Sequence, residues 1–519
     1  MSTQTNYSTR VPGLIAQETS FTSSLKGLCL SARQLLVVMF FLLIFACAAR
    51  PITDPDFWWH LKTGQYLVES RSIPATDMFS TFHTGKEWVT HEWLSQLFIY
   101  GAYELVGFGG LIVLFAGIVT GAFLISYRRF RHLVPHPYVA GLALLLGAFA
   151  TLPTWGVRPQ MFSLLLASVF LLILDRFSRT GGRRGLYWLV PLTVVWVNLH
   201  GGFALGLGLI LLTVVGLGLE GGMVLGWSVK TIWNRVRPLV AIWVACLFSV
   251  ALNPNGVRIY SYPFETIKSR AMMKYIGEWW SPDFHLLMFQ PLASLIFLTL
   301  VVLALSRKHK SLKDLLLLSV TGLAALRSGR NVGFFALVAI PMLAEHSWEW
   351  LRVQRWGKWL TEPEAREEGK TAALKIALNI ILLVIAPVGF ALSRVAVNGS
   401  KQGRVNYDSF PAAAVDFMMA RDLPQPLYNE YGWGGYLIWR AYPQYKVYID
   451  GRADVYGDRF LEEYLMIHGG QKNWRELFER NGIRTALVNP NSPIASLLRQ
   501  EPGWQKLFED PQAAIFTKR

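Results

Sequence analysis

The feature that most constrains this chain is a succession of long apolar segments separated by short basic loops. A helix that crosses a membrane needs about 20 mostly apolar residues, and the shorter segments can tilt or thin the bilayer locally. Only 16% of the 519 residues are charged, against about 25% in soluble domains. The pattern predicts a mainly α-helical, polytopic transmembrane bundle with about 11 spans and excludes an ordinary soluble enzyme. The segments are 34–49, 108–126, 138–155, 160–174, 186–199, 203–219, 238–252, 291–305, 315–326, 332–344 and 376–393.

The charges in the loops predict the orientation of the spans. Lysine and arginine cluster before the first segment and then in every second loop, and the positive-inside rule places these loops in the cytoplasm. The other side receives the hydrophilic stretches 51–107, 253–290 and 395–519. We therefore expect a multi-pass protein of the inner membrane, with a cytoplasmic N-terminus and a periplasmic C-terminal domain. The net charge of +16 belongs to these loops, so nucleic acid is not an expected partner.

Three regions follow from this pattern. Residues 1–32 are expected to form a disordered cytoplasmic leader, residues 33–395 a transmembrane domain with the large outer loop 51–107, and residues 396–519 a periplasmic α/β domain. In that last domain, strands are predicted at 426–429, 446–449, 484–488 and 513–517, and helices near 411–421, 457–467, 471–481 and 493–500.

Two points of topology stay open. The first segment can be a retained anchor or a cleaved signal, because the residues at 46–49 resemble a cleavage site; the many later spans favour the anchor. Residues 315–344 can be a hairpin or one kinked helix, and the kinked helix would put the tail inside. The hairpin is preferred, because the two arginines and the asparagine of 327–331 are costly at membrane depth.

Polar residues at the predicted outer ends of the spans are the candidates for chemistry. Ionisable groups near membrane depth are costly and are usually functional. For any single arginine the alternative is a side chain that extends to interfacial water. The same explanation accounts less well for a whole set of polar residues that are all expected on one side of the membrane. The substrate-binding candidates are His60, Lys62, Arg158, Gln160, Asn198, His200, Arg258, Arg327 and Arg330.

The first outer loop contains the acidic candidates. Asp54-Pro-Asp56 directly follows the first segment and precedes a predicted helix with an aromatic side that suits the membrane surface. One carboxylate is enough to cap that helix, with Pro55 at its first position, so the second carboxylate asks for another explanation. His91 and Glu92 form a second polar pair, for which the start of a helix is the alternative. The catalytic candidates are thus Asp54, Asp56, His91 and Glu92.

With these motifs the chain resembles the GT-C superfamily of membrane glycosyltransferases. The likeness is to bacterial members related to protein mannosyltransferases and to aminoarabinose and lipopolysaccharide-core sugar transferases. It covers about residues 33–395 and implies many spans, a long first outer loop with surface helices and, in many members, a soluble terminal domain. The motifs that carry it are short: Asp54 and Asp56, His91-Glu92, Arg158-Pro-Gln160 and Asn198-Leu-His200-Gly-Gly202.

The resemblance also implies a reaction. A sugar on a polyprenyl phosphate or diphosphate would enter from the bilayer and pass to a lipid, glycan or protein acceptor at the outer face. An acidic side chain would act as general base, and cations, with Arg158 and Arg327 expected first, would stabilise the departing phosphate. Some relatives use a divalent metal and others do not. Mg²⁺ or Mn²⁺ on the oxygens of Asp54, Asp56 and Glu92 therefore stays open.

Two other functions remain as alternatives: a transporter or flippase for a lipid-linked glycan, and a non-catalytic envelope-assembly protein. The resemblance suggests that the tail is an accessory acceptor-binding domain. Its most distinctive segments are 430–436 and 450–454. A tight glycine turn with an Asp–Arg pair is the simpler explanation of the second of these.

Overall fold

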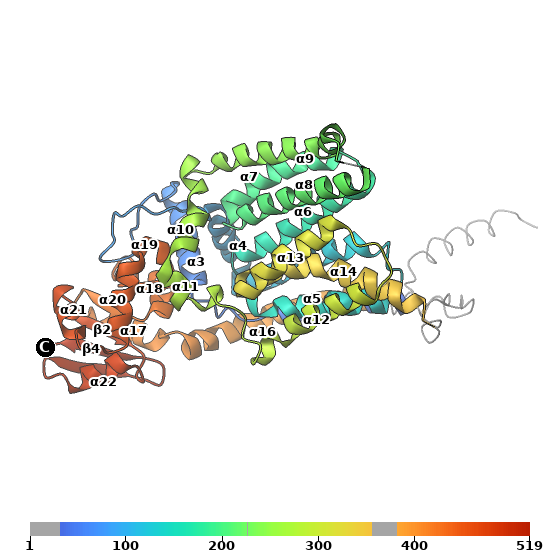
Figure 1. Cartoon of the computed structure of the whole chain (residues 1–519). Coiled ribbons are helices and arrows are strands. Elements are labelled where there is room, and N and C mark those ends of the chain that lie inside the picture. The colour runs from blue at the N-terminus through green and yellow to red at the C-terminus, as the bar shows by residue number, and fades with distance from the viewer. Residues whose placement is uncertain (1–31, 226, 355–380) are drawn as a thin grey trace, which may run out of the picture.

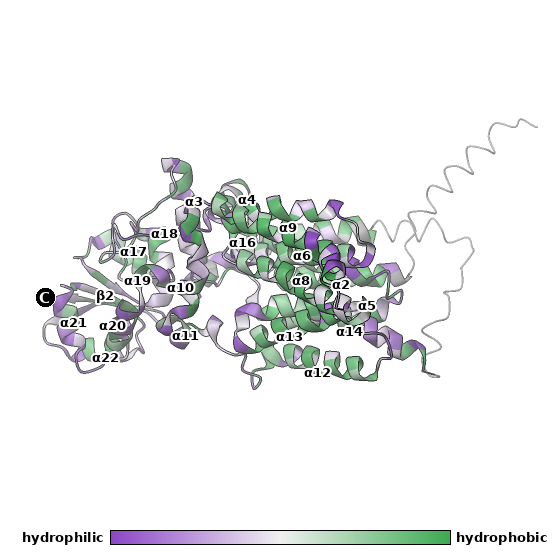
Figure 2. Ribbon diagram, turned by 45° about the horizontal axis from the view of Figure 1, so that its top comes forward, coloured by the Kyte–Doolittle hydropathy of each residue, from purple (hydrophilic) through white to green (hydrophobic). Residues whose placement is uncertain are grey.

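The computed structural model describes residues 32–225, 227–354 and 381–519. A bundle of apolar helices leads into a smaller C-terminal domain, and the first outer loop lies between the two (Figure 1). Colouring by hydropathy shows the bundle as mostly hydrophobic (Figure 2). The predicted leader lies outside the described residues except for its last residue, and the segment 376–393 is described only from 381.

Six helices in the described ranges are long and apolar enough to cross a membrane, and the apolar stretch Gln34–Ala48 is shorter. The expected count of about 11 spans is therefore not confirmed. α7 and α13 are short, and the second half of α14 carries charged side chains. The bundle helices are α2 (Ala32–Ala48), α4 (Trp93–Phe130), α5 (Pro137–Thr151), α6 (Gln160–Thr180), α7 (Leu189–Leu199), α8 (Phe203–Leu225), α9 (Val229–Ser249), α12 (Gln290–Leu305), α13 (Leu312–Arg327), α14 (Val332–Arg352) and α16 (Ala386–Ser409).

The hairpin expected at 315–344 is present. α13 and α14 are separate helices that pack on each other, with Ser328 in an extended conformation between them. The Ser328 hydroxyl donates to the Glu278 carbonyl at 3.0 Å, and the Gly329 amide donates to the Trp280 carbonyl at 3.0 Å. The Gly329 bond to the second outer loop (253–290) uses a backbone N–H that a continuous helix would donate to its own preceding turn. With Ser328 extended as well, the single kinked helix is wrong.

The first outer loop contains the predicted helix, α3 (Phe57–Ser70), but its apolar side does not face the membrane. Trp58 is fully buried, with its ring centroid 5.7 Å from Phe108, 5.5 Å from Phe410 and 5.1 Å from Tyr436. Aromatic edge contacts of this kind add about 0.5–1.5 kcal/mol each beyond area burial. The expected surface helix is thus a buried helix between α4 and the C-terminal domain, because that domain offers a competing apolar surface.

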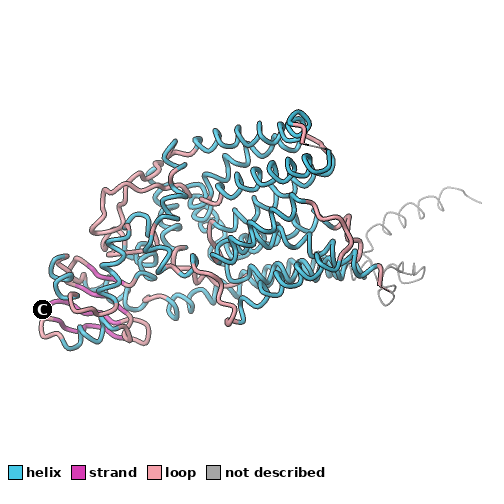
Figure 3. The backbone as a smooth tube through the Cα atoms, viewed as in Figure 1, coloured by secondary structure: helices cyan, strands magenta, loops and turns pink. Residues whose placement is uncertain are grey.

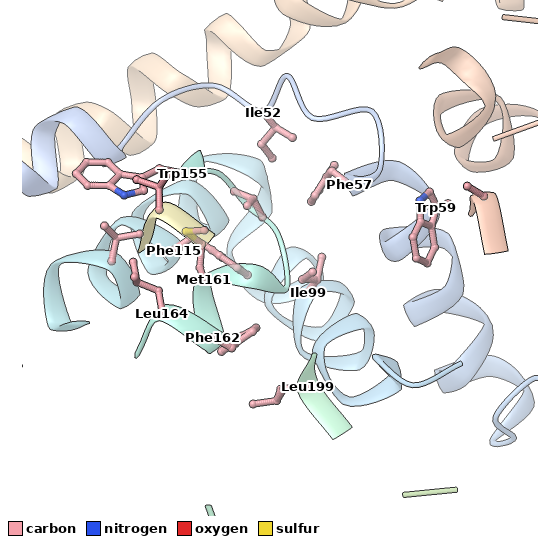
Figure 4. Packing of buried hydrophobic residues seen from close by; sticks show 14 of the residues in the cluster. Ile52, Phe57, Trp59, Ile99, Phe115, Trp155, Met161, Phe162, Leu164 and Leu199 are labelled. Atoms are coloured by element: carbon pink, nitrogen blue, oxygen red, sulfur yellow. The ribbon is translucent and has the colours of Figure 1, made fainter. Parts of the chain in front are cut away.

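The long helix α4 consists of two helical parts that meet at a kink at Gly107. Its φ of 64° and ψ of −171° interrupt the helix, a conformation open to glycine at little cost. The kink separates an outer part, which begins beside His91 and Glu92, from the apolar part that crosses the bundle. Below the outer loop, Phe115 of α4 and Phe162 of α6 pack with ring centroids 5.5 Å apart (Figure 4).

The C-terminal domain contains a four-stranded sheet in the order β1-β2-β4-β3, with β1 parallel to β2 and the other pairs antiparallel. The strands gather in this domain (Figure 3). They are β1 (Leu427–Asn429), β2 (Thr485–Val488), β3 (Trp504–Glu509) and β4 (Ala514–Lys518). The helices are α17 (Ala412–Arg421), α18 (Gly434–Ala441), α19 (Ala453–Tyr456), α20 (Asp458–His468), α21 (Trp474–Arg480) and α22 (Pro493–Gln500).

Three of the four expected strands and all four expected helices of this domain are present. The segment 446–449 is not a strand of the sheet. Val447 instead forms an isolated parallel bridge with Ser80 of the first outer loop. β3 was not expected, because its polar and half-exposed residues give no apolar run. α16 runs without a break across the boundary predicted at 395–396.

Candidate active site

Four charged side chains from distant segments form a chain of ion pairs at the end of the bundle that faces the C-terminal domain. Asp54 precedes α3, Arg158 precedes α6, Glu278 lies in the second outer loop, and Arg330 lies in the α13–α14 turn. Arg158 Nε is 3.0 Å from Asp54 Oδ2, and Arg158 Nη2 contacts Glu278 Oε1. Arg330 Nε lies 3.6 Å from Glu278 Oε2. Burial alone would lower the pKa of Arg158, but the neighbouring carboxylates, Asp54 foremost, raise it.

One carboxylate oxygen of Asp54 keeps capacity for a further donor. Oδ1 accepts the Asp56 backbone N–H at 3.0 Å. Oδ2 is buried and accepts no hydrogen bond from the described residues. The nearby Arg158 Nε–H is directed instead at Gln160 Oε1, at 3.0 Å. Leaving a buried acceptor unsatisfied is costly, so a hydroxyl that donates to Asp54 Oδ2 would be stabilised there.

Asp56 lies beside this chain of ion pairs, and its pKa is unusual for an aspartate. Its Oδ1 accepts the Trp59 indole N–H at 3.2 Å. Burial, with the negative charge of Asp54 as the next cause, raises the pKa of Asp56 to about 7. A carboxyl group with a pKa near the working pH is suited to exchange a proton during a reaction.

Glu92 is surrounded by three imidazoles. Its carboxylate oxygens lie 3.7 Å from His60 Nε2, 3.3 Å from His91 Nε2 and 3.6 Å from His200 Nε2. Burial alone would raise the pKa of Glu92, but the imidazoles, His91 foremost, hold it well below its usual range. Glu92 is therefore ionised at neutral pH although it is buried.

Burial and neighbouring groups affect the protonation of the three histidines differently. His200 Nδ1 accepts the Gly202 backbone N–H at 3.0 Å, and burial lowers the pKa of His200 to about 3, so this ring is neutral. Burial likewise lowers the pKa of His60 to about 4. Both nitrogens of His91 instead face acceptors, the Val89 carbonyl at 3.2 Å and Glu92. Burial alone would lower the pKa of His91, but Glu92 raises it.

Comparisons with known proteins show which fold this chain shares with solved structures. No family model matches the sequence, and no curated protein matches it. Among solved structures, the oligosaccharyltransferase AglB from Archaeoglobus fulgidus, in complex with an inhibitory peptide and a dolichol-phosphate, matches with 10% identity and a TM-score of 0.52, over 88% of this chain and 69% of AglB. The chain has the GT-C fold.

Two further GT-C enzymes align with the chain. The arabinofuranosyltransferase AftD from Mycobacteria is 14% identical with a TM-score of 0.52, over 94% of this chain and 40% of that chain. ArnT from Cupriavidus metallidurans, bound to undecaprenyl phosphate, is 16% identical with a TM-score of 0.47, over 93% of this chain and 97% of ArnT. The AglB and AftD matches confirm the resemblance expected from the motifs as a likeness of fold.

This GT-C chain does not bring all the predicted site residues together. The Asn198 side chain forms its hydrogen bonds with helices and loops of the bundle: its Oδ1 accepts the Trp93 indole N–H at 2.6 Å, and its amide donates to the Val194 and Leu252 carbonyls. Lys62 donates to Gln65 and lies over the rings of Trp439 and Tyr442, in the contact with the C-terminal domain.

Two of the predicted arginines also lie apart from the ion-pair chain. Arg258 pairs with Glu87 and Glu265 at the surface. Arg327 is exposed at the end of α13 and forms no ion pair with the described residues. Arg330, three residues later, points instead toward Glu278. The helix end between them separates the two arginines.

Glu278 is the site residue that the sequence analysis did not single out. It lies between Arg158 and Arg330, and the Arg330 guanidinium also stacks over the ring of the adjacent Trp279, 4.6 Å from its centroid. An acidic residue before two tryptophans in an outer loop was a usable signal. Its partners, however, come from other loops that only the tertiary structure brings near.

The site does not provide a preformed metal centre. Within the described ranges, no group of three His, Cys, Asp or Glu side chains is placed to hold a metal ion. Arg158 lies against the Asp54 oxygen that a metal would need, and Glu92 is surrounded by imidazoles instead of further oxygens. This arrangement does not fit the Mg²⁺ or Mn²⁺ site considered for Asp54, Asp56 and Glu92.

Proposed function

We propose that this protein is an integral-membrane glycosyltransferase. It would transfer a sugar from a polyprenyl-phosphate-linked donor to an acceptor hydroxyl at the outer face of an inner membrane. The observation that carries the proposal is the convergence of Asp54, Asp56, Arg158 and Arg330 at one end of a GT-C bundle. A solved structure of the same fold, AglB, contains a dolichol-phosphate, which supports a lipid phosphate as the carrier.

The carboxylates would supply the base. As the acceptor oxygen attacks the anomeric carbon, its proton passes to a carboxylate, and the bond from that carbon to the phosphate oxygen breaks. Asp54 Oδ2 accepts no hydrogen bond from the described residues and would accept one from the incoming hydroxyl, and Asp56, with a pKa of about 7, is suited to hold the proton. General bases of this kind contribute about 10²–10⁴-fold to rate.

Arg330 is the better placed of the two site arginines to bind the departing phosphate. Arg158 is held between two carboxylates, so its main effect is to orient Asp54. Arg330 makes only a 3.6 Å contact with Glu278, and its side chain is 29% exposed. A guanidinium can donate two hydrogen bonds to one phosphate, and a fixed cation at the leaving group stabilises the charge that develops there.

The Glu92 cluster would orient the sugar. An ionised carboxylate accepts hydrogen bonds and a neutral imidazole can donate one, and sugar hydroxyls need both kinds of partner. His91 and Glu92 therefore stay among the proposed site residues, with His60 and His200 around them.

The experiment that tests the function compares envelope glycans and glycoproteins, by mass spectrometry, in cells with and without this gene. Complementation with Asp54→Asn and Asp56→Asn then links any missing sugar to the site. Asp283→Asn is the matched control, because Asp283 is exposed and its carboxylate caps only the His285 amide of the same outer loop. Full transfer by the double Asn variant would refute the assigned base. A glycan that accumulates unmodified on the inner side would favour the flippase.

A further inference from the structure

A turn of the C-terminal domain lies directly against Asp56. A Cβ atom added to Gly451 would lie 1.6 Å from Asp56 Oδ1, so only glycine permits this approach. The Tyr431 hydroxyl donates to the Gly451 carbonyl at 3.3 Å from the other side. A second close approach lies next to it, where a Cβ on Gly435 would be 2.4 Å from the Pro55 carbonyl oxygen.

Buried ion pairs hold this turn in a fixed position against the first outer loop. Arg452 binds both carboxylate oxygens of Asp450, at 2.8 and 2.7 Å, and its third donor reaches Asp77 Oδ1 at 2.7 Å. All three side chains are 0% exposed. The Tyr456 hydroxyl donates to Asp450 at 2.5 Å, and the guanidinium lies 4.6 Å from the Trp88 ring centroid. A bidentate, fully desolvated arginine of this kind has one well-defined geometry.

These ion pairs join residues from both sides of the interface between the C-terminal domain and the first outer loop. Asp450 and Arg452 belong to the C-terminal domain, whereas Asp77 belongs to the outer loop that also carries Asp56. The backbone between Asp450 and Arg452 therefore has a set position relative to that loop. The Asp56 carboxylate is enclosed between this backbone and the Trp59 indole that donates to it.

We propose that the turn 450–452 of the C-terminal domain is a positioning element of the active site. The ion pair between Arg452 and Asp77 places Gly451 against Asp56 and thereby sets the orientation of the Asp56 carboxylate. This inference rests on the proposed function for its catalytic meaning. The C-terminal domain would then be a wall of the reaction site as well as an accessory domain, and Asp77, Gly451 and Arg452 would be positioning residues.

The test is Gly451→Ala in the full-length protein, purified in lipid nanodiscs. The new methyl group must push Asp56 away, and a misplacement of about 1 Å at a reacting group can cost on the order of 100-fold in rate. We expect kcat to fall by about that factor while KM for the polyprenyl-phosphate donor stays unchanged. Gly432→Ala is the control, because a Cβ there meets nothing within 4 Å. A wild-type kcat for Gly451→Ala would overturn the proposal.

A double-mutant cycle on the thermal unfolding midpoint, which needs no substrate, tests the contact separately. Gly451→Ala should lower the midpoint in the wild-type background and have no effect in an Asp56→Ala background, where the opposing oxygens are gone. Equal losses in both backgrounds would show that Gly451 does not act through Asp56 and would overturn the inference. If the wild-type protein lacks transfer activity, the proposed function fails, and the cycle still decides whether the turn positions Asp56.

Discussion

Arg158 Nε lies 3.0 Å from Asp54 Oδ2, in a pair whose side chains are only 14% and 15% exposed. The pair joins the first outer loop to the start of α6, and Glu278 brings the second outer loop to the same guanidinium. Charges so far removed from water interact more strongly than surface pairs do. Arg158 therefore connects three loops that have no other reason, at the level of sequence, to meet.

Replacing Arg158 by Gln should destabilise the protein and abolish transfer. The buried Asp54 carboxylate would lose its guanidinium partner, Glu278 would keep only Arg330, and removal of one partner of a buried pair costs about 3–5 kcal/mol. We expect a clearly lower thermal unfolding midpoint and loss of sugar transfer. Arg459→Gln serves as control, since Arg459 is 90% exposed in an i,i+4 pair. Equal midpoints for the two variants would contradict the role given to Arg158.

Transfer should increase with pH as Asp56 loses its proton. Burial and the charge of Asp54 raise the pKa of Asp56 to about 7, so a base at this position is half protonated near neutrality. We expect the rate to rise through about pH 7 and then level, and this step should disappear in Asp56→Asn. An unchanged pH profile in the variant would mean that another group takes the proton.

The same shift predicts how stability varies with pH. The pKa of Asp56 is higher in the folded protein than the unfolded value of about 3.9, so ionisation opposes folding. Stability from this group is therefore lost progressively as pH rises from about 4 to about 7. The unfolding midpoint of Asp56→Asn, relative to wild type, should increase over that window. Differential scanning fluorimetry between pH 4 and pH 8 measures this, and a flat difference would exclude a protonated Asp56.

His91 should stabilise the fold most at low pH. Glu92 raises the pKa of His91 above its usual value of 6.5 against the effect of burial, so the imidazolium is favoured in the folded state. The stabilisation is complete below about pH 6.5, the unfolded value, and is lost as pH rises through the higher folded pKa. The midpoint difference between wild type and His91→Gln should therefore shrink as pH rises. The same comparison with the exposed His285→Gln is the control.

The two arginines of the α13–α14 turn should differ in donor binding. Arg330→Gln removes a cation that faces Glu278 beside Arg158, and a charged hydrogen bond is worth about 1.5–3 kcal/mol. We expect affinity for polyprenyl phosphate to fall by about tenfold or more, measured by titration in nanodiscs. Arg327→Gln, at an exposed helix end, should bind as wild type does. The reverse order would restore the role first expected for Arg327.

The sequence was informative where a property is local. Apolar runs predicted the bundle, the cost of the charges at 327–331 predicted the hairpin, and the local sequence predicted four helices of the C-terminal domain. It was misleading where an apolar surface had a choice of partners. α3 suited a membrane surface by its aromatic side, but it is buried against Phe108, Phe410 and Tyr436, and the segment 446–449 pairs with the outer loop instead of the sheet.

The sequence by itself determined that this is a helical membrane chain with acids and cations at one end, because segment length and charge distribution are read along the chain. Only the tertiary structure decided which charges meet: Arg158 with Asp54 and Glu278, Glu92 with His60 and His200, and Asp77 with Arg452. Those contacts join residues far apart in the chain, and a guanidinium near membrane depth can bind any carboxylate that reaches it. The packing of helices and loops selects the partner.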